Sequence, residues 1–186
     1  MVGLIILTIV VVFPLVWMIA TYNTLVALRN HIRESWSDVD TELQRRYELI
    51  PNLVAAVKGY AKHERETLEN VIELRNQCAA DQGSVHHQEG TERKLVAGVQ
   101  KLLAVAEAYP DLKADQNFLQ LQRELVNTED RIQAARRFYN GNIRDYQNKR
   151  EAFPSNLVAG MFNFQPHDFF AVDPATREAP KVEGAF

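Results

Sequence analysis

The chain of 186 residues is poor in several kinds of residue, and each shortage excludes a class of protein. Its single cysteine, Cys78, excludes an internal disulfide framework and a zinc site built from cysteines. Eight glycines and seven prolines are too few for a turn-rich β-sandwich or barrel. Because 21 Lys and Arg residues stand against 24 Asp and Glu residues, there is no basic excess with which to bind nucleic acid. The length predicts one domain, or two at most.

Charge is absent from residues 1–28, and Arg29 is the first charged side chain. Residues 1–20 read MVGLIILTIVVVFPLVWMIA. As a helix this run would be about 30 Å long, which matches the hydrocarbon core of a bilayer. A cleaved signal peptide would need basic residues before the run and a small-residue cleavage site after it, and neither is present. We therefore expect residues 1–28 to be an uncleaved transmembrane anchor.

The residues that flank the apolar run predict which way it crosses the membrane. Trp17 and Tyr22 fall where an interfacial aromatic belt would lie. Arg29 and Arg33 follow the run, so the positive-inside rule places the body in the cytoplasm and the amino terminus outside. Glu34 lies beside these arginines and weakens the bias, which leaves a periplasmic body as the alternative.

From Trp36 onward the apolar residues return every three or four positions, which predicts an α-helix with one buried face, close to a heptad repeat. No turn signal separates this stripe from the anchor, so we expect one long helix that ends near Gln82. Pro51 should kink this helix or split it in two. The stripe comprises Trp36, Val39, Leu43, Tyr47, Ile50, Val54, Val57 and Ala61, and continues through Leu68 and Cys78.

Two further stripes complete the predicted body, residues 29–153. Glycines bound a predicted loop over 83–90, and Thr91 is expected to cap the helix that follows it. A last long helix should run from Phe118 to Phe153. No segment alternates apolar and polar residues as a strand would. The sequence thus predicts an all-α fold, in which a single transmembrane helix continues into an antiparallel bundle of three or four helices with a very long first helix.

The segment of residues 154–172 differs in character from the bundle. No Asp, Glu, Lys or Arg falls between Glu151 and Asp168. A segment this apolar must pack against the bundle itself, a neighbouring subunit or the membrane interface. Residues 173–186 are expected to form a disordered tail. The phenylalanines of the segment are Phe162, Phe164, Phe169 and Phe170.

No arrangement of residues predicts chemistry. His63 and Glu64 begin a zincin-like motif, but position 67 is threonine where the motif needs a second histidine. Cys78 falls on the apolar stripe and is expected to be a buried thiol. The sequence has no glycine-rich phosphate loop and no serine elbow. We therefore expect no catalysis, no cofactor and no metal site.

Two arginine pairs, Arg45–Arg46 and Arg136–Arg137, could bind anionic lipid. A solvated helix face that carries ion pairs explains them more simply. Glu42 and Arg46 have the i, i+4 spacing of a favourable ion pair on the wet face of the first helix. We therefore expect these arginines to face solvent.

Several strings of the sequence coincide with a known family. They are YNTLVALRN at 22–30, LQRRYELIPNLVAAVKGYAKHERETLE at 43–69, ARRFYNGNIRDYQ at 135–147 and FPSNLVAGMFNF at 153–164. Together with Trp36 and the single N-terminal span, these strings resemble the LemA family of bacterial membrane proteins over residues 1–170. Gln147 departs from the pattern, because a second Tyr–Asn pair is expected there.

The resemblance implies a helical bundle behind one span of the inner membrane, with the amino terminus outside. It implies no established enzymatic activity. Members of the family are associated with membrane organisation, with envelope stress and with the formation of organelle membranes in magnetic bacteria.

The leading hypothesis is a membrane-anchored scaffold that self-assembles and organises or shapes the inner membrane, since the anchor runs directly into a rigid helix. The alternative is an adaptor that docks another membrane protein, such as a protease in envelope stress, through the C-terminal phenylalanines. Expected partners are further copies of the chain, the bilayer or another membrane protein, but no nucleic acid. Candidate contact residues are Tyr22, Asn23, Trp36, Arg45, Arg46, Tyr60, His63, Glu64, Phe162, Phe164, Phe169 and Phe170. The competing interpretation is that these residues tie helices together within the bundle.

Overall fold

The computed structural model describes residues 1–61, 63–81 and 85–171. Within these ranges the chain forms helices and no strand, so the predicted all-α fold is confirmed. The expected tail over 173–186 lies outside the described residues. The helices are α1 (Val2–Tyr60), α2 (Arg65–Ala80), α3 (Val85–Ala106), α4 (Pro110–Lys113), α5 (Gln116–Glu151) and α6 (Ser155–Met161).

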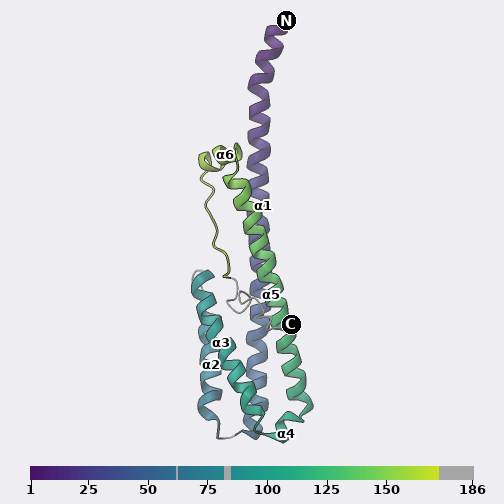
Figure 1. Cartoon of the computed structure of the whole chain (residues 1–186), viewed down its shortest axis with the longest axis vertical. Coiled ribbons are helices and arrows are strands. Elements are labelled where there is room, and N and C mark those ends of the chain that lie inside the picture. Colours follow the sequence, from purple (N-terminus) through teal and green to yellow (C-terminus); the bar gives the residue numbers. More distant parts are fainter. Residues whose placement is uncertain (62, 82–84, 172–186) are drawn as a thin grey trace, which may run out of the picture.

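The first helix, α1, is 59 residues long and extends well beyond the rest of the molecule (Figure 1). It is the one helix among the described residues that is long and apolar enough to cross a membrane. Only 11% of its most apolar window is buried within the protein, so this part is not a core helix. Phe13 and Val16 are largely exposed there, whereas Thr21 and Leu25, just after the apolar run, are buried. The bundle therefore begins where the apolar run ends.

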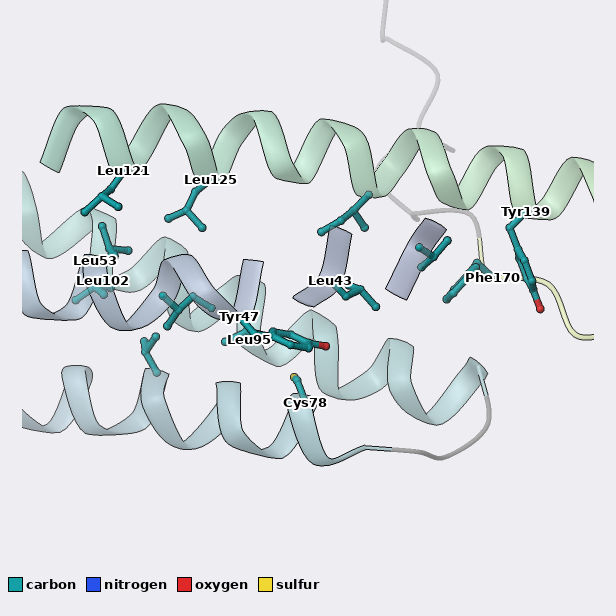
Figure 2. Close-up of a cluster of buried hydrophobic side chains, with 14 of the residues drawn as sticks. Leu43, Tyr47, Leu53, Cys78, Leu95, Leu102, Leu121, Leu125, Tyr139 and Phe170 are labelled. Carbon is teal, nitrogen blue, oxygen red and sulfur yellow. The ribbon is translucent and has the colours of Figure 1, made fainter. Parts of the chain in front are cut away.

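The second half of α1 is the central helix of an antiparallel bundle. The long helix α5 runs beside it in the opposite direction, and α2 and α3 pack as a pair against its lower part (Figure 1). The buried side chains form one continuous core, part of which is seen in Figure 2. Its largest members include Leu25, Ile50 and Leu53 of α1, Val71 of α2, Leu95 and Leu102 of α3, and Ile132, Ile143 and Tyr146 of α5.

Of the two outcomes predicted for Pro51, a kink or a split, the split does not occur, because α1 remains helical to Tyr60. A proline lacks the N–H that would bond to the carbonyl four residues earlier, which here is the carbonyl of Tyr47. The guanidinium of Arg75 on α2 donates a hydrogen bond of 3.0 Å from Nε to that carbonyl. A neighbouring helix thus replaces the hydrogen bond that Pro51 cannot make.

The prediction that the first helix extends to near Gln82 is also wrong. The helix ends at Tyr60, and Ala61 and Glu64 belong to a turn that leads into α2. In that turn the Glu64 N–H donates to the Ala61 carbonyl at 3.2 Å. Reversing the chain here lets the second part of the stripe, including Val71 and Cys78, pack back onto α1. Burial of that stripe favours the turn over a continuous helix.

The loop predicted over 83–90 is helical from Val85 onward, while residues 83 and 84 lie outside the described ranges. Thr91 therefore does not cap the helix but lies inside it. Its hydroxyl donates to the Asp81 carboxylate at 2.9 Å, and the His87 ring also pairs with that carboxylate at 2.8 Å. These polar contacts fix the first turns of α3 despite the two glycines, Gly83 and Gly90, that suggested a loop.

The last long helix, α5, begins at Gln116 with Asp115 as its cap, whose carboxylate accepts a hydrogen bond from the Phe118 N–H at 2.9 Å. It ends at Glu151, short of the predicted end at Phe153, and the Phe153 side chain is 82% exposed. The short helix α6 then folds back beside α1 (Figure 1).

Candidate functional site

The chain leaves α6 through a residue in the left-handed region. Asn163 has φ of 55°, a conformation that asparagine adopts more readily than most residues. The Phe164 N–H then donates to the Ala159 carbonyl at 2.9 Å, which is the pattern of a Schellman helix end. This turn directs residues 162–171, here called the strap, back along the bundle beside α5 (Figure 1).

Polar side chains of α5 hold the strap by its backbone. Tyrosine, amide and guanidinium groups donate to successive carbonyl oxygens, and Asn140 also accepts from the strap. Gln147, which departs from the family pattern, is one of the donors. The bonds are Arg150 Nε to Phe164 O (2.9 Å), Tyr146 OH to Gln165 O (2.7 Å), Gln147 Nε2 to His167 O (3.1 Å), Asn140 Nδ2 to Phe170 O (3.0 Å) and Phe170 N to Asn140 Oδ1 (2.9 Å). Several backbone groups of the strap thus find side-chain partners without joining a helix.

Aromatic rings fix the lower end of the strap. Phe170 is 3% exposed and stacks on Trp36 of α1, with ring centroids 5.6 Å apart and planes 8° apart. It also meets Tyr139 of α5 edge to face at 5.2 Å, and these two rings lie side by side in Figure 2. The guanidinium of Arg136 lies 4.9 Å from the centre of the Phe170 ring. One strap residue therefore joins α1 to α5.

The upper end of the strap packs on α1 near the end of the apolar run. Tyr22 contacts Phe162 at 4.8 Å and Phe164 at 5.6 Å, both edge to face. Phe164 is buried, and the Arg29 guanidinium lies 5.5 Å from the centre of its ring. The strap is therefore anchored by aromatic contacts at both ends and by polar bonds between them.

Beside the lower end of the strap lies a cluster of charged side chains, here called the ionic cluster, between α1, α3 and α5. The Arg46 side chain is only 4% exposed, and it pairs with Glu92 of α3 and, at 2.8 Å, with Glu129 of α5. The Tyr47 hydroxyl donates to Glu92 as well. The remaining charged members are Glu89, Arg93 and Arg136. The expectation that Arg46 faces solvent and pairs with Glu42 is therefore wrong, because its side chain points into the bundle.

The ionic cluster and the strap are connected. Glu89, which is buried, accepts a hydrogen bond of 3.3 Å from the Ala171 N–H and pairs with Arg93 at 3.0 Å. The hollow between these groups measures about 170 Å³. Because Arg46, Arg93 and Arg136 face the three glutamates across it, the charges in the hollow balance, and no excess of one sign is present to attract a free ion.

Burial shifts the pKa values of groups in and near the ionic cluster. It raises the pKa of Tyr47 to about 12 and, more than any other cause, raises the pKa of the Cys78 thiol. It also lowers the pKa of Arg136, with the nearby Arg46 acting in the same direction. Cys78 is thus kept as a thiol, which does not favour a role as a nucleophile.

The structure brings together about half of the residues predicted as contacts. Two of them lie on α1 and contact phenylalanines of the strap that are far away in the sequence. Tyr22 contacts Phe162 and Phe164, and Trp36 contacts Phe170. Arg46 belongs to the ionic cluster.

The other predicted contact residues are placed elsewhere. Asn23 and Arg45 are exposed on α1, and Phe169 is 44% exposed on the strap. At the far end of the bundle, the Tyr60 hydroxyl donates to Asp115 at 3.2 Å. His63 is exposed and Glu64 half-buried in the turn before α2.

Sequence reasoning missed Glu89 and Glu92. A signal for them exists, because both continue the stripe of Leu95, Val99 and Leu102 backwards in steps of three, which places them on the buried face of α3. Glu89 falls in the loop predicted over 83–90, whereas Glu92 falls at the start of the predicted helix, directly after its expected cap, Thr91. The strap donors Gln147 and Arg150 carry no such signal, because their partners are backbone atoms of a segment without periodicity.

Among the described residues no three His, Cys, Asp or Glu side chains are grouped so that they could hold a metal ion. Most polar groups of the site are instead paired with one another or with the backbone, although Nε of Arg46 and Nε of Arg136 are buried without a hydrogen-bond partner in the described part of the chain. The arrangement is therefore a structural connection between the helices α1, α3 and α5.

Comparison with known proteins gives a consistent result. The model of the LemA family matches residues 35–183. The chain is similar to protein LemA of Metamycoplasma hominis, with 26% identity over 166 residues that cover 84% of this chain and 74% of the relative. It is also similar to magnetosome protein MamQ 2 of Paramagnetospirillum magneticum, with 25% identity over 198 residues that cover 91% of this chain and 73% of the relative. The names of these relatives specify no reaction.

Proposed function

The chain belongs to the LemA family and is a membrane-associated helical protein, and on this premise we propose that it is a scaffold whose copies assemble side by side and organise the inner membrane. One observation carries the proposal. The apolar run and the bundle share a single unbroken helix of 59 residues, about 90 Å long. The tilt of the span in the bilayer and the tilt of the body are therefore coupled, so contacts between bodies would act on the membrane.

The surface of the body supports contacts between copies. A groove of about 780 Å³ runs between α1 and α2, with an apolar floor and charged groups of both signs along its edges. On α5, which flanks α1 on its other side (Figure 1), Val126 and Phe138 are 56% and 62% exposed. An apolar centre with a polar rim is typical of protein interfaces. Different surfaces that meet head to tail form a closed ring when the rotation between copies closes, and an open filament when it does not. The groove is lined by Val54, Lys58, Arg65, Leu68, Glu69, Ile72, Glu73 and Asn76.

The mass of the full-length protein in mild detergent, measured by light scattering, tests self-assembly. We expect a discrete oligomer, and we expect Phe138→Ser to lower its mass. Phe153→Ser is the matched control, because Phe153 is equally an exposed phenylalanine but lies at the membrane end of the body. A monomer at every concentration would contradict the proposal.

We further propose that the body lies in the cytoplasm, since Arg29 and Arg33 follow the span. Protease added to spheroplasts should then leave the body intact until the membrane is permeabilised. Digestion in intact spheroplasts would place the body on the outer side.

A second candidate function is an adaptor that holds another membrane protein in the same groove. Phe164 and Phe170 are buried within the chain, so the C-terminal phenylalanines left for docking are Phe162 and Phe169. The groove is the larger apolar surface and the better docking element. Photo-crosslinking in native membranes from Ile72→benzoylphenylalanine separates the two functions. A product of twice the chain mass favours the scaffold, and a product with a different protein favours the adaptor.

In both proposals the protein acts without catalysis. The one thiol of the chain, Cys78, is buried with a raised pKa, which does not favour a role as a nucleophile.

A further inference from the structure

α6 lies at the end of the body from which the apolar part of α1 emerges (Figure 1). The Phe162 residue that follows it contacts Tyr22 with ring centroids 4.8 Å apart. Tyr22 follows the twenty-residue apolar run by two positions, which is about 3 Å along the helix axis. When α1 spans a bilayer, α6 therefore lies at the depth of the lipid headgroups.

One face of α6 is buried on the bundle and the opposite face is open. Val158 and Ala159 are each 3% exposed, and they attach the helix to the body. Leu157 and Met161, four residues apart and therefore on one face, are 61% and 69% exposed. Phe153, just before the helix, is 82% exposed. Large apolar side chains are seldom gathered on a water-facing surface without a partner.

The apolar surface of α6 is continuous with that of the span. Trp17 of α1 and Phe153 line the same hollow, which measures about 510 Å³. Towards the amino terminus, Val16 and Ile19 on α1 are 58% and 57% exposed, as lipid-facing residues of a span are. Lys149 lines the same hollow, where its ammonium group can reach lipid phosphates while its carbon chain stays on apolar surface.

The charge pattern agrees with a lipid-facing surface. No acidic or basic residue falls between Glu151 and Asp168, so nothing on α6 opposes entry into the interface. Short amphipathic helices bind membranes by placing such an apolar face at the boundary between headgroups and acyl chains.

We propose that α6, with Phe153 and Phe162, is a second membrane-contact element that inserts its exposed face into the lipid interface beside the protein's own span. This rests on α1 crossing the membrane and not on self-assembly. A single helix leaves a protein free to rotate about its axis and to tilt. A second contact, fixed to α1 through Tyr22 and the strap, determines which side of the body faces the bilayer.

Fluorescent labelling of the full-length protein in vesicles of phosphatidylethanolamine and phosphatidylglycerol tests this proposal. In a Cys78→Ala background, single cysteines are introduced by Leu157→Cys, Met161→Cys and, as controls, Val16→Cys and Phe138→Cys. Val16 reports on the span, and Phe138 is an exposed apolar residue of the body away from α6. Each cysteine carries the same polarity-sensitive dye, and quenching by nitroxide-labelled lipids is measured.

We expect the labels at 157 and 161 to be quenched to within about twofold of the label at 16, because interfacial side chains lie within reach of lipid. The label at 138 should be quenched several-fold less. Quenching at 16 without quenching at 157 and 161 would overturn the proposal. This holds both when the dyes at 157 and 161 are in water and when a protein contact covers them. Absence of quenching at all positions would overturn it together with its premise that α1 spans the bilayer, whereas the oligomer mass tests self-assembly separately.

Discussion

Two regions tie the helices to α1, and they use polar groups in opposite ways. In the ionic cluster, Arg46 and Glu92 are charged groups almost entirely removed from water. Along the strap, most donors to backbone oxygens are neutral amide and phenol groups such as Asn140 and Tyr146, with Arg150 as the charged exception, while Phe170 provides the buried apolar surface. A buried charge depends on its partner, because an unpaired ion in the interior is very costly. A neutral bond depends far less on any single partner. The two regions should therefore respond very differently to single substitutions.

The largest expected effect is in the ionic cluster. Arg46→Ala removes the partner of the buried Glu92 and should lower the free energy of unfolding by about 3–5 kcal/mol. Arg45→Ala is the matched control, because Arg45 is the neighbouring residue but is exposed, and its effect should stay within about 0.5 kcal/mol. Urea titration of the full chain in mild detergent, followed by circular dichroism, measures both.

A double variant sharpens this test. Arg46→Met combined with Glu92→Leu removes both buried charges and should recover most of the stability that Arg46→Ala loses. If the double variant is no more stable than the single one, the loss comes from packing and not from an orphaned charge.

The strap should depend mainly on its aromatic anchor. Phe170→Ala opens a cavity between Trp36 and Tyr139 and should cost about 3 kcal/mol, the lower end for such a truncation, because the strap lies at the edge of the bundle. Phe169→Ala, at the adjacent and half-exposed position, should cost less than about 1 kcal/mol. The same urea titration compares them, with Trp36 fluorescence as a local signal. Equal losses would mean that Phe170 does not anchor the strap.

Loss of a single polar side chain that holds the strap should matter less. Asn140→Ala removes two hydrogen bonds to the backbone of Phe170 and should cost about 1–2 kcal/mol. Hydrogen exchange at the Phe170 amide should become faster, while exchange in the core of α3 stays unchanged. Acceleration spread over the whole bundle would show instead that the strap and the bundle open as one unit.

The same contrast explains what the sequence could predict. The stripes from Trp36 to Val57 and from Phe118 to Tyr146 identified the paired helices α1 and α5, since burial in a helix has a period that sequence reveals. The continuity of the apolar run with the bundle was also predicted. These features depend on one helix and its own pattern.

The features that were missed depend on partners far away in the chain. Pro51 remains helical because Arg75 bonds to the carbonyl that it leaves free. Arg46 is buried because it forms ion pairs with Glu92 and Glu129, although its spacing from Glu42 suggested an ion pair on the surface. The strap has no periodicity, and only the donors of α5 determine its path. The local sequence does not predict such pairings, because the partners come together only when the helices pack side by side.

An effect visible only at high pH lies where the two kinds of chemistry meet, at Tyr47, a neutral phenol that donates to the buried carboxylate of Glu92. Burial raises the pKa of Tyr47 to about 12 in the folded protein from its ordinary value of 10. Folding thus favours the neutral phenol, so its contribution is fully present below pH 10 and is lost as the pH rises from 10 to about 12. Urea titrations across this window should show stability falling less steeply in Tyr47→Phe than in the wild type. The slopes should agree below pH 10, because neither protein then changes its charge at this position. Equal slopes above pH 10 would mean that Tyr47 ionises as easily in the folded chain as in the unfolded one, and that the ionic cluster tolerates a further negative charge.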